Sequence, residues 1–403
     1  MCSALTSDVN VTISFHKDSQ DNPIRSVLSP TRSESIPIPL ELRVQGSNLT
    51  REGIFILATK PITVMGLSSG IYTAASFLAL PIDALGVEYY VVTWERDMSS
   101  IEFLIIGVYN NTDVQLTLPT SISLNGYFAE RGNPFTETIN RLDTLQIQAM
   151  EDLSGTRIEA NKKIAVISGN AKAVVSPTPR NYSDHAIEML PSVDKWGKHF
   201  IVTSTPLRRL HDYMKLVSEF HNTNVSMNCG SIKSFTLEEA NKIHNEALYS
   251  GSSCEIISDQ PILVVLFTNN QINQSDKSDP SMVLIPPVEQ WGNAFTFSVD
   301  AIFENYLILI VRDKDRYELL LNGTTVNFHS FKQIQGTDFY SGFQRISKGV
   351  HSLTHQSGNA SFSALLYGKK NQVAYYVPVG MNLNSLYQVS INQWSKQSTL
   401  EYI

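Results

Sequence analysis

The sequence predicts an all-β fold of tandem β-sandwich modules, jelly-roll or immunoglobulin-like, each about 100 residues long. Three observations lead to this prediction. A short apolar phrase recurs along the chain, a second marker recurs with a similar period, and the segments between them alternate apolar and polar residues. A unit of this length suits a small domain, because propeller blades and helical repeats are roughly 35–50 residues long.

The first marker is an apolar run that is followed by Leu-Pro or Ile-Pro. Ile62, Ile164 and Ile262 hold the same place in three runs, 102 and 98 residues apart, and Phe362 follows 100 residues later in a weaker fourth copy. The three clear runs read KPITVMG at 60–66, KIAVISG at 163–169 and QPILVVL at 260–266. Four copies predict four modules.

The second marker is a polar turn that precedes an alternating segment, and it places Val11, Val114, Val225 and Val326 at a similar period. The first copy lacks the opening phrase, so we expect the chain to begin inside a module or to be a fragment of a longer protein. Each module is expected to close its own apolar core. The predicted units are residues 1–72 (truncated module 1), 73–172 (module 2), 173–271 (module 3), 272–380 (module 4) and 381–403 (a C-terminal tail).

Short β-branched and aromatic runs predict strands within each module. In the second module the expected strands cover 89–94, 102–109, 114–118, 142–150, 157–160 and 164–168, with turn residues between several of them. Six to eight strands in about 100 residues are typical of a two-sheet sandwich. Residues 237–248 are the best candidate for a helix.

Composition narrows the possible functions. The net charge of −7 argues against binding to nucleic-acid phosphates, and the one compact basic pair, Arg208-Arg209, is interpreted as an exposed loop. No apolar run is long enough for a membrane span, and residues 1–8 do not resemble a signal peptide. Because the first module looks truncated, this last absence carries little weight.

The cysteines and glycosylation sequons leave alternatives open. Cys229 and Cys254 lie 25 residues apart in one module and are either a disulfide or two buried thiols, while Cys2 is left over. Asn-X-Ser/Thr sequons are either glycan acceptors in turns or simply good turn residues. The candidate acceptors are Asn10, Asn48, Asn110, Asn181, Asn224, Asn273, Asn322 and Asn359.

Motifs for catalysis and for metals are scarce. Residues 66–70 match G-x-S-x-G, which would make Ser68 a hydrolase nucleophile, but the equivalent places in the other copies indicate only a small-residue turn. His351 and His355 have helical metal spacing in a segment that looks like a strand. We therefore predict no catalytic, metal or cofactor-binding residues. The repeated Trp196 and Trp291 are expected to cover the ends of module cores or to meet a neighbouring module.

An ordered set of phrases resembles the N-terminal domain of the IgG Fc-binding protein family. The phrases are Leu80-Pro81, EYYVVT at 88–93, DLSGTRI at 152–158, KIAVISG at 163–169, EMLP at 188–191, WG at 196–197 and MVLIP at 282–286. The resemblance implies a secreted, non-catalytic, β-rich binding or adhesion region with a protein or glycoprotein ligand in mucus or matrix. It carries no residue of an antibody site over to this chain.

Two other functions remain open at this point. One is a serine hydrolase that uses Ser68, and the other is a structural spacer in a mucin-like assembly. Nucleic acid is not an expected partner of the binding region, and no membrane span is expected.

Overall fold

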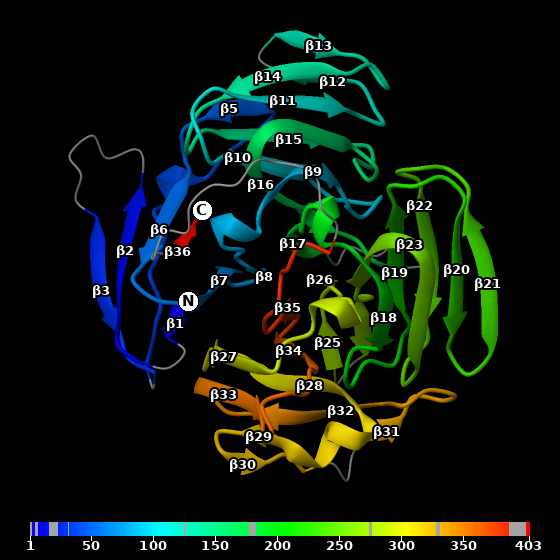
Figure 1. The fold of residues 1–403 in the computed structure, drawn as a ribbon. Helices are drawn as coiled ribbons and strands as arrows, with labels where there is room; N and C mark the ends of the chain where they lie inside the picture. Colours follow the sequence, from blue (N-terminus) through cyan, green and yellow to red (C-terminus); the bar gives the residue numbers. More distant parts are fainter. Residues whose placement is uncertain are drawn as a thin grey trace.

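The structure is a computed structural model that describes residues 2–4, 7–15, 23–30, 32–124, 126–176, 183–273, 276–327, 331–386 and 400–403. Within these residues the chain forms antiparallel β-sheets joined by turns and five short 3-10 helices. The sheets group into four units that follow the chain, as tandem β-sandwich modules should (Figure 1). The 3-10 helices are η1 (Leu40–Leu42), η2 (Ile82–Ala84), η3 (Val193–Lys195), η4 (Val288–Gln290) and η5 (Asp313–Glu318).

The first unit consists of two four-stranded sheets, with the orders β4-β1-β7-β8 and β3-β2-β6-β36. One strand from this part of the sequence, β5 (Asn48–Thr50), instead joins the sheet of the second unit through β15. The strands of the first unit are β1 (Cys2–Ala4), β2 (Val9–Phe15), β3 (Ile24–Leu28), β4 (Ser33–Glu34), β6 (Ile54–Ala58), β7 (Ile62–Ser69), β8 (Ala74–Leu78) and β36 (Leu400–Tyr402).

The second unit is built around one long strand, β16, which pairs with β9, β10, β11 and β17. The two strands expected at 157–160 and 164–168 are parts of β16, whose pairing with β9 shifts register between Glu159 and Ile164. The strands are β9 (Gly86–Tyr90), β10 (Ile101–Gly107), β11 (Thr112–Thr117), β12 (Ile122–Leu124), β13 (Tyr127–Ala129), β14 (Phe135–Ile139), β15 (Thr144–Ala149), β16 (Arg157–Ala173) and β17 (Asp184–Met189).

The third unit repeats this plan around the long strand β23, which pairs with β18, β19, β20 and β26. The helix expected at 237–248 is wrong, because these residues end one strand, turn and form the next. Asn241 in the turn has φ 60°, a left-handed conformation that ends any helix. The strands are β18 (Gly197–Thr203), β19 (Asp212–Ser218), β20 (Thr223–Asn228), β21 (Ile232–Leu237), β22 (Ile243–Leu248), β23 (Ser253–Phe267), β24 (Gln271–Asn273), β25 (Asp276–Ser278) and β26 (Met282–Leu284).

The fourth unit has two sheets, with the orders β27-β33-β29-β30 and β31-β32-β28-β34-β35. Its strands are β27 (Ala294–Val299), β28 (Glu304–Arg312), β29 (Leu319–Leu321), β30 (Thr324–Thr325), β31 (Lys332–Gln333), β32 (Phe339–Ile346), β33 (Gly349–His355), β34 (Ser363–Lys370) and β35 (Val373–Pro378).

The four units surround a common centre (Figure 1). One strand of each unit lies at this centre, and these strands are called here the inner strands β8, β17, β26 and β35. β8 contacts both β17 and β35, and β26 also contacts both β17 and β35, so the inner strands form a closed ring of neighbours.

The sequence repeat explains this pseudo-symmetry. Each inner strand pairs with the strand that carries the repeated apolar run, and the residue just after each inner strand donates its N–H to a carbonyl in that run. The four equivalent bonds are Ala79 to Val64 at 2.9 Å, Leu190 to Val166 at 2.8 Å, Ile285 to Val264 at 3.0 Å and Val379 to Ala364 at 2.9 Å.

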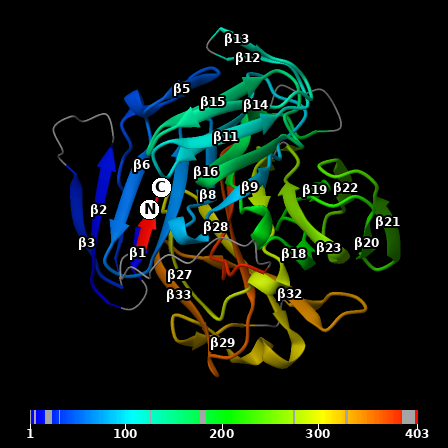
Figure 2. The same cartoon turned by 45° about the horizontal axis from the view of Figure 1, so that its top comes forward.

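The last described strand closes the ring. β36 pairs with β6 in the first unit, with Tyr402 opposite Ile56, and the Tyr402 hydroxyl donates to the carbonyl of Ile62 at 2.6 Å. In Figures 1 and 2 the two described ends of the chain lie close together at the first unit. Residues 400–402, predicted as part of a tail, therefore contribute a strand to the unit that was predicted to be truncated.

The apolar cores are shared between units, which differs from the expectation of a separate core in each. One cluster joins Val64 of the first unit to Phe297 and Val377 of the fourth, and a second joins Val166 of the second unit to Val265 of the third. A third cluster joins the third and fourth units. The division at residues 72, 172, 271 and 380 stays a prediction, although β7 and β8 pair across the first of these boundaries.

Candidate binding surfaces

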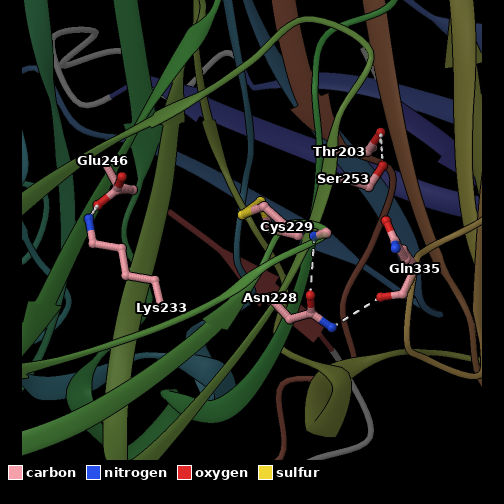
Figure 3. The surroundings of a disulfide bond; sticks show 9 residues. Thr203, Asn228, Cys229, Lys233, Glu246, Ser253 and Gln335 are labelled. Carbon is pink, nitrogen blue, oxygen red and sulfur yellow. Dashed lines mark hydrogen bonds and ion pairs between the residues drawn. A yellow bond between two sulfur atoms is a disulfide. The ribbon is translucent and has the colours of Figure 1, made fainter.

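The structure joins Cys229 and Cys254 by a disulfide (Figure 3). β20 pairs with β23 so that Asn228 lies opposite Glu255, and the two cysteines form the next pair in the ladder, with their Cα atoms 4.2 Å apart. Cys254 is buried, and so is the free Cys2 in β1, whose thiol pKa is raised by that burial. A disulfide at this place fixes the end of β20 to the long central strand.

The disulfide lies beside the boundary between the third and fourth units. The Asn228 side chain donates to the carbonyl of Gln335 at 3.0 Å and accepts from the N–H of Gly230 at 3.1 Å (Figure 3). The Ser253 hydroxyl, next to Cys254, lies 3.2 Å from the Ser341 hydroxyl of the fourth unit. The covalent bond thus stiffens an edge that contacts the neighbouring unit.

Most of the described sequon asparagines lie at the surface. Asn48 is half-buried, Asn181 lies outside the described residues, and Asn273 ends β24. In three units the turn near a sequon contains an asparagine with a left-handed backbone: Asn111 (φ 53°), Asn222 (φ 55°) and Asn322 (φ 52°). Asparagine tolerates this conformation, so both interpretations of the sequons remain. The exposed acceptors are Asn10, Asn110, Asn224, Asn322 and Asn359.

The G-x-S-x-G segment is a β-hairpin. Ser68 is an exposed residue in β7 and pairs with Ala75 of β8, and the Gly70 N–H donates to the carbonyl of Thr73 at 2.8 Å to close the turn. A nucleophile elbow requires a turn from a strand into a helix. Within the described ranges, no hydrogen bond joins the Ser68 hydroxyl to a histidine or a carboxylate, so the geometry that would activate this serine is not present there.

His351 and His355 are buried structural residues of β33. His351 Nδ1 lies 3.0 Å from the Asn322 side-chain amide, and its Nε2 lies 2.9 Å from the carbonyl of Ser347. His355 is held by the Ser357 hydroxyl and by a backbone carbonyl. In the part of the chain that the structure describes, no group of three histidine, cysteine or acidic side chains could hold a metal ion.

Both repeated tryptophans are buried and make the same bond. Trp196 donates its indole N–H to the carbonyl of Pro191, and Trp291 donates to that of Pro286, each at 3.2 Å. Trp196 also packs against Tyr90 of the second unit, with ring centres 5.8 Å apart. The tryptophans therefore fix the link from an inner strand to the next unit, and Trp196 meets its neighbour as expected.

A candidate binding surface lies on residues 204–211 of the third unit, named here the Arg208 loop. Arg209 is exposed, as the sequence predicts, whereas Arg208 is buried. The Arg208 guanidinium donates to the Tyr367 hydroxyl at 3.1 Å, to the carbonyl of Asp279 at 2.8 Å and to the carbonyl of Asn269. The hydrogen bonds from this buried guanidinium to several acceptors hold the loop in place on its inner side.

The anchored loop presents apolar side chains to solvent. Leu207 is 46% exposed and Leu210 is 41% exposed, and Tyr249 on the adjacent turn is 70% exposed. The rings of His211 and Tyr249 lie 6.0 Å apart, which joins loop and turn into one surface. Leu207 has φ 63°, a conformation that costs a non-glycine residue about 1 kcal/mol and that the surrounding bonds must hold.

Two buried carboxyls lie near the anchor: Asp184 begins β17, and Asp279 precedes β26. Burial raises the pKa of Asp184 to about 8, although its side chain accepts from the Ala74 N–H at 3.0 Å and from the Thr73 side chain. Burial likewise raises the pKa of Asp279 to about 7, and the Arg208 charge opposes that increase. The sequence gives no signal for this cluster, because Asp184 belongs to the second unit whereas Asp279 and Arg208 belong to the third and lie 71 residues apart.

Comparison with known proteins identifies the family. The family model described as IgGFc binding protein matches residues 75–368. The chain belongs to this family. A human relative, IgGFc-binding protein, is 24% identical over 360 residues, which cover 88% of this chain and 6% of the relative. The chain therefore spans only a small part of the length of that curated relative.

Comparison with solved structures adds no argument. The crystal structure of the major pilin from Streptococcus pyogenes aligns with 73% of this chain and 98% of its own, at 8% identity, but its TM-score is only 0.15. Separately, no helix in the described ranges has the length and apolar character of a membrane span.

Proposed function

We propose that this region is a non-catalytic, extracellular binding or adhesion module whose ligand is a protein or glycoprotein of mucus or matrix. The observation that carries the proposal is the Arg208 loop. It combines exposed leucine, tyrosine and arginine side chains on a backbone that a buried arginine holds in place. Tyrosine and arginine are enriched in the cores of protein interfaces, and a pre-organised loop loses less entropy on binding.

The cysteines and sequons support the extracellular compartment. A structural disulfide such as Cys229–Cys254 persists in oxidising compartments. Exposed sequons are accessible glycan acceptors in a secreted protein. We propose Asn10, Asn110 and Asn359 as the first sites to examine. The side-chain amides of the other two exposed acceptors already have partners, because that of Asn224 donates to Asp259 and that of Asn322 lies 3.0 Å from His351 Nδ1. Peptide mass spectrometry of secreted protein measures their occupancy.

The first ligand to test is the Fc fragment of immunoglobulin G, which the name of the human relative states. A purified mucin glycoprotein is the second. The complete chain is immobilised, and binding of each ligand is measured by biolayer interferometry. We expect saturable binding of at least one ligand, with at least a tenfold loss in the Leu207→Asp/Leu210→Asp double variant.

The matched control is Phe220→Asp, an exposed apolar residue at the opposite end of β19 from the Arg208 loop. This control should bind as the wild-type chain does. Failure of both ligands to bind saturably would favour a structural spacer. Equal losses in the loop variant and in the control would remove the Arg208 loop from the proposal.

A further inference from the structure

We propose that a pocket at the boundary between the fourth and first units binds a neutral sugar. The pocket has a volume of about 410 Å³, within the roughly 300–1,000 Å³ of small-molecule sites. It lies between β27, the 359–361 turn and the segment that follows β35, and Thr63 of β7 completes it from the first unit. It is remote in sequence from the Arg208 loop, so the two binding proposals can fail independently.

The chemistry of the lining indicates an uncharged ligand. No lysine, arginine, histidine or acidic residue lines the pocket, so a charged ligand would lose its hydration without gaining an opposite charge. The polar side chains are all amides or hydroxyls, which both donate and accept hydrogen bonds, as sugar hydroxyl and acetamido groups do. These polar residues are Thr63, Asn293, Thr296, Asn359, Ser361 and Asn382.

Much of this polar capacity is unused by the protein. The Asn293 amide donates to the carbonyl of Gly358 at 2.7 Å. Within the described residues, the side chains of Thr63, Thr296, Ser361 and Asn382 have no hydrogen-bond partner, although Thr296 is only 5% exposed. A ligand that bonds to these groups therefore breaks no bond within the protein.

Two aromatic residues, Trp291 (4% exposed) and Phe295 (7% exposed), support the pocket from the protein interior. Trp291 is fixed by its bond to the Pro286 carbonyl, and Phe295 packs edge-on against Phe362 with ring centres 5.3 Å apart. A Cβ atom at Gly292 would fall 2.8 Å from the Phe295 ring, and one at Gly380 would fall 2.5 Å from it, so glycine at both places gives the ring its room. The small apolar surface that these residues leave beside the hydroxyls and amides can contact part of the C–H face of a pyranose ring, while the polar groups bond to its rim.

The sugar could come from either of two sources. Asn359 and Ser361 line the pocket and belong to one sequon, so a glycan on Asn359 of the same chain would begin at the pocket itself. A glycan of a bound partner would offer the same chemistry. The shared ligand is the di-N-acetylchitobiose core of N-linked glycans, and that disaccharide is the probe.

The test is isothermal titration calorimetry of the complete, unglycosylated chain with di-N-acetylchitobiose. We expect saturable binding that is weakened at least tenfold by Asn382→Asp, which places a charge in the neutral pocket, and by Thr296→Val. Asn384→Asp, two residues beyond the pocket, is the matched control and should leave binding unchanged. Glucuronic acid, an anionic sugar, should bind at least tenfold more weakly.

A second comparison separates the two sources. Chain secreted from eukaryotic cells is compared with the unglycosylated chain, so that every residue that lines the pocket is the same in both. Binding of free chitobiose only by the unglycosylated chain would place the chain's own glycan in the pocket, and equal binding by both would indicate a partner's glycan. The proposal is overturned if unglycosylated chain binds no chitobiose, or if Asn382→Asp and Asn384→Asp bind it equally well.

Discussion

The boundary between the second and third units is held together differently from the boundary between the fourth and first. At the former, Lys215 is only 1% exposed, and its ammonium lies 3.0 Å from Glu95 and 3.4 Å from Asp152 of the second unit. The same ammonium lies 5.1 Å from the centre of the Trp94 ring. A buried cation with partners across the boundary joins two units that are consecutive in sequence.

At the latter boundary the two units share an apolar cluster, which contains Val64 of the first unit, Phe297 of the fourth and Tyr402 of β36. β36 comes from the end of the sequence and adds to β6 of the first unit, with the Tyr402 side chain buried. Contacts between inner strands occur at both boundaries and follow from the repeat, whereas the Lys215 contacts and the Tyr402 contacts each occur at one boundary only. Because the units share their cores, we expect them to unfold together, so that a substitution at either boundary destabilises all four units.

The largest expected effect is that of Tyr402→Ala. It removes a buried ring and the bond to the Ile62 carbonyl, and we expect it to lower the free energy of unfolding by about 3–4 kcal/mol. The control Tyr402→Phe keeps the ring and should lose only about 1 kcal/mol. Urea unfolding monitored by tryptophan fluorescence measures both. Equal, small losses in the two variants would show that β36 does not close the ring.

Removing the disulfide should be the next largest change. By the loop-entropy model, the 25-residue separation of Cys229 and Cys254 gives about 3.5 kcal/mol, which Cys229→Ser/Cys254→Ser should lose. Because this bond lies far from β36, its loss should add to that of Tyr402→Ala within about 0.5 kcal/mol. A triple-variant cycle measures the coupling, and strong coupling would contradict the separation of the two places.

Lys215→Ala tests the contacts at the boundary between the second and third units. We expect a loss of about 2–3 kcal/mol, because Asp152 and Glu95 keep their charges without the partner and the packed lysine stem is removed. Lys215→Met keeps most of the stem but leaves the same two carboxylates without their partner, so it should recover only the packing part of the loss and still cost about 1–2 kcal/mol. Equilibrium unfolding at pH 7 compares the two. A methionine variant as unstable as the alanine variant would mean that the charge, and not the stem, dominates.

The smallest effect concerns the boundary between the first and second units, where Asp184 accepts from the Ala74 N–H. The pKa of Asp184 is raised to about 8 by burial, so the folded state keeps a proton that the unfolded state releases above about pH 4. Its contribution to stability is complete below pH 4 and is lost as the pH rises towards 8. Asp184→Asn should reduce the fall in stability between pH 5 and 6 by about 1 kcal/mol.

Thermal or urea unfolding at the two pH values tests this sign. If the pH dependence of stability is unchanged in Asp184→Asn, another buried carboxyl group causes it. Asp279, whose pKa is raised to about 7, is the first alternative. The matched variant Asp279→Asn therefore completes the comparison.

The sequence predicted the fold through its repeats. The repeated positions lie in, or directly before, the strands that pair with the inner strands: Ile62, Ile164, Ile262 and Phe362. The helix at 237–248 was wrong because its good helix formers are overridden by pairing of β21 with β20 and β22 with β19. Local preference is weak where neighbouring strands offer a complete ladder.

The candidate sites were less predictable. Arg208 looked like half of an exposed basic pair, because its acceptor Tyr367 lies 159 residues away in the sequence. The sugar pocket likewise combines Thr63 with residues near 293, 359 and 382, which only ring closure brings together. A sequence motif cannot show a site whose parts come from opposite ends of the chain.

The most direct test of the closed ring is hydrogen–deuterium exchange of the complete chain along a urea series. If the four units share their cores as the structure indicates, the backbone amides of β7, β16, β23 and β34 should lose protection at one common urea concentration, and Tyr402→Ala should lower that concentration for all four. Separate transitions, or a Tyr402→Ala effect confined to β6 and β7, would show that the units are independent beads.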